Sequence, residues 1–169
     1  MEKVLEVKDL VTTFRIGKQE YEVLRGISFD IHANETVCMV GESGCGKSVT
    51  TLSIMDLLPN NGRVVSGSIK LNGQELTTLP HKARNALRGK QMGMIFQEPM
   101  TALNPLLTIG RQLTEGLRLH LGMNKAEAYQ TALSYLEKVG IANPETRMKQ
   151  YPFQLSGGLR QRIMIAMVM

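Results

Sequence analysis

The sequence predicts an α/β fold, and three features of the chain favour that class. Along roughly the first forty residues, apolar and polar positions alternate as they do in strands. A glycine-rich turn then follows an apolar run and precedes a helical stretch. From residue 98 onward, apolar residues recur every three or four positions, which is the period of a helix. A strand-rich front and a helical back half suit a single α/β unit, and 169 residues are enough to bury its core.

The expected elements change from strands to helices along the chain. Alternating or β-branched runs predict strands at residues 4–7, 11–16, 27–31, 36–40, 67–73 and 92–96. Helical periodicity predicts helices at residues 47–58, 80–88, 109–121 and 124–139, and one from residue 156 to the last residue. Asn124 with Glu127 three residues later suits a capping box. Few strands are expected after residue 96 to lie parallel to the earlier ones, although a phosphate-binding loop normally has such neighbours.

Composition excludes several other classes of protein. No apolar run approaches the length of a membrane span, and residues 1–6 carry acids without the apolar region of a secretory signal. Cys38 and Cys45 cannot form a disulfide framework or a metal site, so we expect a reducing cytosol. The net charge of +5 comes from scattered basic residues and aromatic content is 5%, so no nucleic-acid partner is expected.

The glycine-rich turn carries the clearest chemistry in the chain. Residues 41–48 spell G-x-x-x-x-G-K-S directly after the apolar run 36–40, a pattern typical of a phosphate-binding loop. Its glycines let backbone N–H groups turn toward an anion, and the following helix adds its positive end. Lys47 is expected to reach the β- and γ-phosphates, and Ser48 to offer a hydroxyl to Mg²⁺. The binding residues expected here are Gly41, Glu42, Ser43, Gly44, Cys45, Gly46, Lys47, Ser48 and Val49. The loop therefore predicts binding of a nucleoside triphosphate.

A second motif lies about 110 residues further on, at residues 155–162. Ser156 is expected to cap a helix, while Gly157 and Gly158 expose their N–H groups at its positive end. Taken alone, this segment would be a capped helix after a glycine turn. Two phosphate-type motifs in one chain favour a second anion site.

Together the motifs resemble those of the nucleotide-binding subunits of ATP-binding-cassette (ABC) transporters. Residues 155–158 match the signature motif of that family, and Gln97, after the run 92–96, matches its Q-loop. Residues 41–50 and 96–105 are similar to the branch that serves dipeptide, oligopeptide and nickel importers.

The resemblance implies how the chain is organised. It implies a single, partial ABC domain over residues 1–169, an α/β P-loop fold with an antiparallel N-terminal part. Within it, residues 1–97 approximately would form the β part and P-loop core, residues 98–155 the helical subdomain, and residues 156–169 the start of the signature helix. The last strands of the core would be missing.

The resemblance also implies the remaining roles at the site. Phe14, or Tyr21 as second choice, would stack on the adenine of ATP. Gln97 would offer an oxygen to Mg²⁺ or to the attacking water, and would act with Lys47 in catalysis. Ser156, Gly157 and Gly158 would close on the γ-phosphate bound to a second subunit. The family's Mg²⁺-binding Asp, catalytic Glu and switch His would follow the signature helix, but the eleven residues after Gly158 contain no Asp, Glu or His. We therefore expect this chain alone to bind ATP without hydrolysing it.

Partners and location follow from the same resemblance. The subunit would lie at the cytoplasmic face of the cell membrane as a peripheral protein. It would contact permease subunits and a second ATPase subunit, identical or paralogous, and an external solute-binding protein would act indirectly. Two other functions stay open: a non-transport ABC ATPase acting on nucleic acid or ribosomes, and a nucleotide-binding module without hydrolysis.

Overall fold

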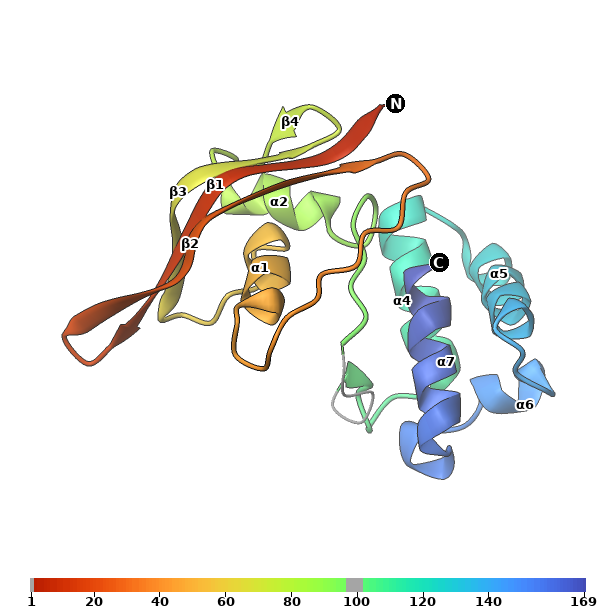
Figure 1. Ribbon diagram of the computed structural model, residues 1–169. Helices are drawn as coiled ribbons and strands as arrows, with labels where there is room; N and C mark the ends of the chain where they lie inside the picture. The colour runs from red at the N-terminus through yellow and green to blue at the C-terminus, as the bar shows by residue number, and fades with distance from the viewer. Residues whose placement is uncertain (1, 97–101) are drawn as a thin grey trace. The chain divides into compact units, whose positions relative to one another are not determined.

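The computed structural model describes residues 2–96 and 102–169 (Figure 1). Gln97, expected to contact Mg²⁺ or water, lies outside the described residues. The chain divides into two compact units, Met1–Ala86 and Leu87–Met169, which are described separately below.

The first unit contains a four-stranded antiparallel sheet in the order β2-β1-β3-β4. Its strands are β1 (Lys3–Ile16), β2 (Gln19–His32), β3 (Gly62–Leu71) and β4 (Gln74–Glu75). The runs predicted at 4–7 and 11–16 are one continuous strand, because a shift of register near Asp9, whose φ is +48°, interrupts the apolar alternation. The antiparallel N-terminal part of the predicted fold is thus confirmed.

Two helices accompany the sheet, α1 (Lys47–Ile54) and α2 (His81–Leu87). The buried hydroxyls of Thr12 on β1 and Ser53 on α1 lie 2.9 Å apart, which fixes α1 against the sheet. The prediction extended α1 to residue 58, but the helix ends four residues earlier. Asp56 has a left-handed φ of +54° that a helix cannot continue, and its carboxylate lies 2.9 Å from the Arg84 guanidinium of α2.

Two predicted strands are absent from the structure. Residues 36–40 have no strand conformation. In the run 92–96, Met92 forms an isolated bridge with Arg88, and residues 93–96 have no strand conformation. Val40 is 87% exposed and Phe96 is 45% exposed, so both runs keep their apolar side chains near solvent. A strand forms only when a neighbour completes its backbone hydrogen bonds, and the described residues supply neither run with one. Both strand predictions are therefore wrong for this chain.

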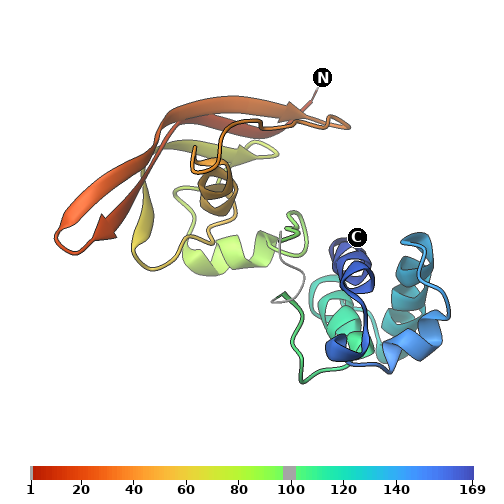
Figure 2. The ribbon, with the colours of Figure 1, turned by 60° about the horizontal axis from the view of Figure 1, so that its bottom comes forward.

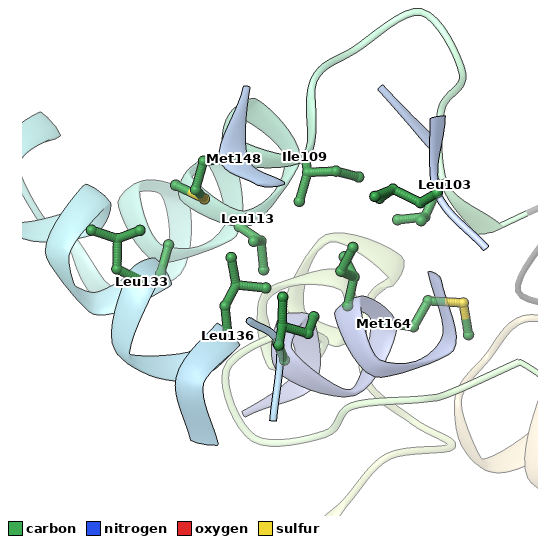
Figure 3. Close-up of a cluster of buried hydrophobic side chains, with 12 residues drawn as sticks. Leu103, Ile109, Leu113, Leu133, Leu136, Met148 and Met164 are labelled. Atoms are coloured by element: carbon green, nitrogen blue, oxygen red, sulfur yellow. The ribbon is translucent and has the colours of Figure 1, made fainter. Parts of the chain in front are cut away.

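The second unit is helical. It contains α4 (Ile109–Leu121), α5 (Lys125–Lys138), α6 (Pro144–Met148) and α7 (Gly157–Val168), with a short 3₁₀ turn at Pro152–Gln154 (Figure 2). Side chains from α4, α5, α6 and α7 meet in one apolar core (Figure 3). Its most buried members are Leu103, Ile109, Ala132, Leu136, Ile163 and Ala166.

Helix caps in this unit fall where the sequence placed them. Asn124 accepts from the backbone N–H of Ala126 at 2.9 Å and of Glu127 at 3.0 Å, and the Glu127 carboxylate accepts from the Asn124 N–H at 2.9 Å. The predicted capping box is therefore confirmed. Gly140 follows the C-cap of α5 with a φ of +73°, as a helix end requires.

Candidate nucleotide-binding site

The loop from Gly41 to Lys47 depends on glycine at two points. Gly44 and Gly46 have φ values of +84° and +99°, a region that residues with a Cβ rarely adopt. Gly46 is also the N-cap of α1, and a Cβ built on it would lie 2.8 Å from Cδ2 of Leu24 on β2. Leu24 is 1% exposed and has little room to move. Residue spacing does not predict this contact, because the burial of Leu24 depends on how β1 and β2 pair.

The Lys47 ammonium binds to backbone carbonyls of its own loop. Its Nζ donates to the backbone carbonyls of Gly41 at 2.7 Å and Glu42 at 2.6 Å, and lies 3.4 Å from Cys45 Sγ. A Cβ on Gly41 would lie 2.6 Å from that sulfur, so a larger residue there would force the Cys45 side chain to turn aside. The loop therefore holds a full positive charge among its own carbonyl groups.

The first turn of α1 leaves its N–H groups available. Gly46 has no side chain to cap the helix, and the first turn contains no acidic residue. The first N–H groups of a helix have no partner within the helix and carry its positive partial charge. Ser48 is exposed on this same turn. Lys47, Ser48 and the N–H groups of the first turn thus lie together at the start of α1.

A hollow of about 360 Å³ lies beside the loop. Its lining is mostly apolar and includes Ile27, Phe29, Val37, Met39, Val40 and Cys45. It lies along the run 36–40, which the sequence placed in a buried strand.

The two candidates for stacking on adenine lie opposite each other in the same unit. Phe14 on β1 pairs with Tyr21 on β2. The Phe14 ring covers Gly62 on β3, where an added Cβ would lie 2.8 Å from Cε1. Tyr21 is 48% exposed and its hydroxyl donates to the Gln19 side chain at 2.5 Å. Because directly opposed residues share a face of the sheet, both rings remain candidates.

The second predicted anion site lies in the second unit. The Ser156 side chain caps α7 by accepting from the N–H of Leu159 at 3.4 Å, as predicted. Gly157 and Gly158 are exposed, and a Cβ on either would meet no atom within 4 Å. The first turn of α7 contains no acidic residue. The amides of Gly157 and Gly158 are therefore accessible to an anion. The loop of residues 41–48 belongs to the other unit.

The described residues contain no cluster of three or more His, Cys, Asp or Glu side chains that could hold a metal ion. In the part of the chain that the structure describes, no helix combines the length and the hydrophobicity needed to cross a bilayer.

A glycine-turned loop with an internal lysine at a helix start defines the class of P-loop nucleotide-binding proteins. The sequence profile of the ABC transporter family matches residues 24–169, and the chain belongs to this family. The chain is 50% identical over 170 residues to the dipeptide transport ATP-binding protein DppD of Bacillus subtilis, covering all of this chain and 51% of that protein. It is 46% identical over 166 residues to the oligopeptide transport ATP-binding protein OppD of Salmonella typhimurium, covering 98% of this chain and 49% of that protein.

Solved structures agree with this assignment. The dimeric structure of MJ0796, described as a bacterial ABC transporter cassette, matches with a TM-score of 0.85 at 25% identity, covering 98% of this chain and 68% of that one. The chain thus has the fold of part of an ABC cassette, and it spans about half the length of the curated relatives it matches.

Proposed function

We propose that the chain is the ATP-binding part of a subunit that powers import of peptides or related small solutes across the cytoplasmic membrane. The observation that carries this proposal is the loop of residues 41–47, with Lys47 among its carbonyls and a helix start left without a side-chain cap. The relatives DppD and OppD, named for dipeptide and oligopeptide transport, support the choice of solute.

Binding of ATP would replace contacts within the loop by contacts to phosphate. The Lys47 ammonium donates to neutral carbonyls, and a charged phosphate oxygen is a stronger acceptor for it. The N–H groups of α1 would receive further phosphate oxygens, and Phe14 or Tyr21 would stack on the adenine. Ser48 and Gln97 would hold Mg²⁺, which supplies positive charge beside the β- and γ-phosphates.

The second anion site would act on a neighbouring molecule. Ser156, Gly157 and Gly158 would contact the γ-phosphate bound to the loop of a second ATPase subunit, identical or paralogous, in a head-to-tail pair. MJ0796 offers support, since it has been solved as a dimer and also in a dimeric post-hydrolysis state with ADP and phosphate. ATP binding would close the pair and hydrolysis would reopen it. This motion would pass to the permease subunits at the cytoplasmic face of the membrane, with an external solute-binding protein supplying the solute.

In the chain as given, we expect binding without turnover. Lys47 and Gln97 supply part of the catalytic chemistry, but residues 159–169 contain no Asp, Glu or His to complete it. Phosphate release by the purified chain should stay at background in the presence of MgATP. Turnover that disappears in Lys47→Ala would contradict this expectation.

Nucleotide binding is tested most directly at Lys47. With a fluorescent N-methylanthraniloyl ATP and Mg²⁺, Lys47→Ala should weaken binding by roughly thirtyfold or more, because it removes a charge-assisted contact. Lys82→Ala, which changes an exposed lysine on α2 of the same unit, is the matched control and should bind as the unchanged chain does. Equal affinities in the two variants would refute the proposal.

The importer role has a separate test. In cells, the subunit that carries this chain should co-purify with an integral membrane protein. Co-purification with ribosomes or nucleic acid in its place would favour the non-transport alternative.

A further inference from the structure

A long-range contact ties the signature helix α7 to the end of α5. One guanidinium nitrogen of Arg162 on α7 donates to the backbone carbonyls of Val139 at 3.0 Å and Gly140 at 3.1 Å. These carbonyls lie at and just after the C-cap of α5, where a helix leaves acceptors without internal partners and carries its negative partial charge. Arg162 therefore caps α5 from another helix.

Gly140 is shaped to receive this side chain. A Cβ on Gly140 would lie 2.7 Å from the same Arg162 nitrogen, and the residue also has a φ of +73°. Any larger residue would both strain the backbone and push the guanidinium away. The end of α5 and the arginine of α7 are thus fitted to each other.

The apolar contacts of α7 do not fix its position alone. Ile163 and Met164 are buried in the same core as Leu136 of α5. Apolar burial depends on area and has little directional preference, so it permits small shifts of a helix along its axis. Two hydrogen bonds to fixed carbonyls limit such a shift, since hydrogen-bond geometry tolerates a change of only a few tenths of an ångström.

We propose that Arg162 is a positioning residue that fixes where the turn 156–158 lies, along the axis of α7, relative to the apolar core of the second unit. This inference rests on the proposed function, in which that turn contacts the γ-phosphate of a neighbouring subunit's nucleotide. Arg162 lies five residues after Gly157, or about 7–8 Å along the helix at 1.5 Å per residue, so it stays clear of the ligand and acts through the helix. A second arginine contact holds the entry to the helix, because Arg160 donates to the Leu155 carbonyl at 2.9 Å.

The first test measures backbone amide exchange of residues 156–160 in the full chain. Arg162→Met should speed exchange there about three- to fivefold, because an exposed charge at a helix end contributes modestly. Arg162→Lys, which keeps a cation in reach of the carbonyls, should restore most of the protection. Arg118→Met, at an exposed arginine in the last turn of α4, is the control and should leave exchange unchanged.

Gly140→Ala provides a second variant at the other end of the contact. Gly140→Ala should speed exchange of the same amides. Adding it to Arg162→Met should bring no further increase, since both substitutions remove the same contact between Arg162 and the end of α5. Independent, additive effects of the two substitutions, equal exchange in Arg162→Met and Arg118→Met, or no recovery in Arg162→Lys would each overturn the proposal.

A second readout separates this inference from the proposed function. Sedimentation with MgATP should show that Arg162→Met weakens pairing of two chains at least threefold, while binding of the fluorescent ATP to the single chain changes less than twofold. Unchanged pairing in Arg162→Met would overturn the positioning role. If the unchanged chain binds no nucleotide or does not pair, the proposed function fails, and amide exchange with the lysine rescue then decides the role of Arg162.

Discussion

The two helices that begin at the predicted anion sites start in opposite ways. Helix α1 begins at Gly46, which has a left-handed φ of +99° and no side chain to cap the helix. Helix α7 begins at Ser156, whose hydroxyl caps it, in an extended backbone conformation. The first start leaves its N–H groups without a side-chain acceptor, while the second is partly satisfied by its own residue.

Under the proposed function, this difference predicts that the site at α1 gains more from a bound ligand than the site at α7. At α1 the nearest positive charge, on Lys47, is held by the loop carbonyls of Gly41 and Glu42, so a bound anion would improve several contacts at once. At α7 the cap at Ser156 completes the helix, and Gly157 and Gly158 add open amides to a turn that is already stable. This is the difference expected if the loop of residues 41–48 holds a nucleotide and the turn 156–158 contacts a nucleotide that another subunit holds.

The largest effect is expected from a substitution at the start of α1. Gly46→Ala places a Cβ in a left-handed conformation and 2.8 Å from Cδ2 of the buried Leu24, so we expect about 2–3 kcal/mol of lost stability from strain and overpacking together. Urea unfolding of the first unit measures the loss, and binding of the fluorescent ATP should fall with it. Gly17→Ala is the control, because its φ of +64° brings the same kind of strain with no atom within 4 Å of the added Cβ. A loss no larger than about 1 kcal/mol in Gly46→Ala, equal to that in Gly17→Ala, would show that contact with Leu24 is unimportant.

A pH-dependent effect of intermediate size concerns the unit that carries α1. Burial acts to raise the pKa of Glu75, but hydrogen bonds from the Ser68 and Thr77 hydroxyls and from the N–H groups of Thr77 and Ile69 outweigh it and lower the pKa to about 2. A carboxyl whose pKa is lower in the folded state stabilises the fold above its unfolded value of 4.5, and this contribution is lost as the pH falls toward 2. We expect Glu75→Gln to cost roughly 1–3 kcal/mol at pH 7 and to flatten the decline in stability between pH 5 and pH 2.

Urea unfolding at several pH values, followed by amide exchange in residues 62–77, measures this effect. Glu22→Gln, at an exposed position on β2, is the control. An acid-induced decline that is as steep in Glu75→Gln as in the unchanged chain would contradict the role assigned to Glu75.

The comparison also shows what the sequence could and could not predict. Local chemistry was predicted well: Ser156 caps its helix, Asn124 forms its capping box and the loop of residues 41–48 opens α1. Each of these depends on residues within a few positions of one another. The runs 36–40 and 92–96 were wrongly predicted as strands, because their apolar pattern is local but a strand needs a partner from elsewhere in the chain. The contacts of Leu24 with Gly46 and of Arg162 with Gly140 were not predicted for the same reason, since they join residues 22 positions apart in each case.

The smallest expected effect sharpens the contrast at α7. Ser156→Ala removes the hydroxyl that accepts from Leu159, and because that hydrogen bond is long, at 3.4 Å, we expect a loss of about 0.5–1 kcal/mol in the stability of the second unit. Ser156→Gly should cost only about a few tenths of a kcal/mol, since glycine is tolerated at an N-cap. Thr108→Ala is the matched control, because Thr108 caps α4 through a bond of the same 3.4 Å length to the N–H of Arg111. Equal losses of stability in Ser156→Ala and Thr108→Ala, with nucleotide-driven pairing reduced only in Ser156→Ala, are the expected result. Pairing that is reduced equally by both substitutions would show that the turn at Ser156 acts only as a helix cap.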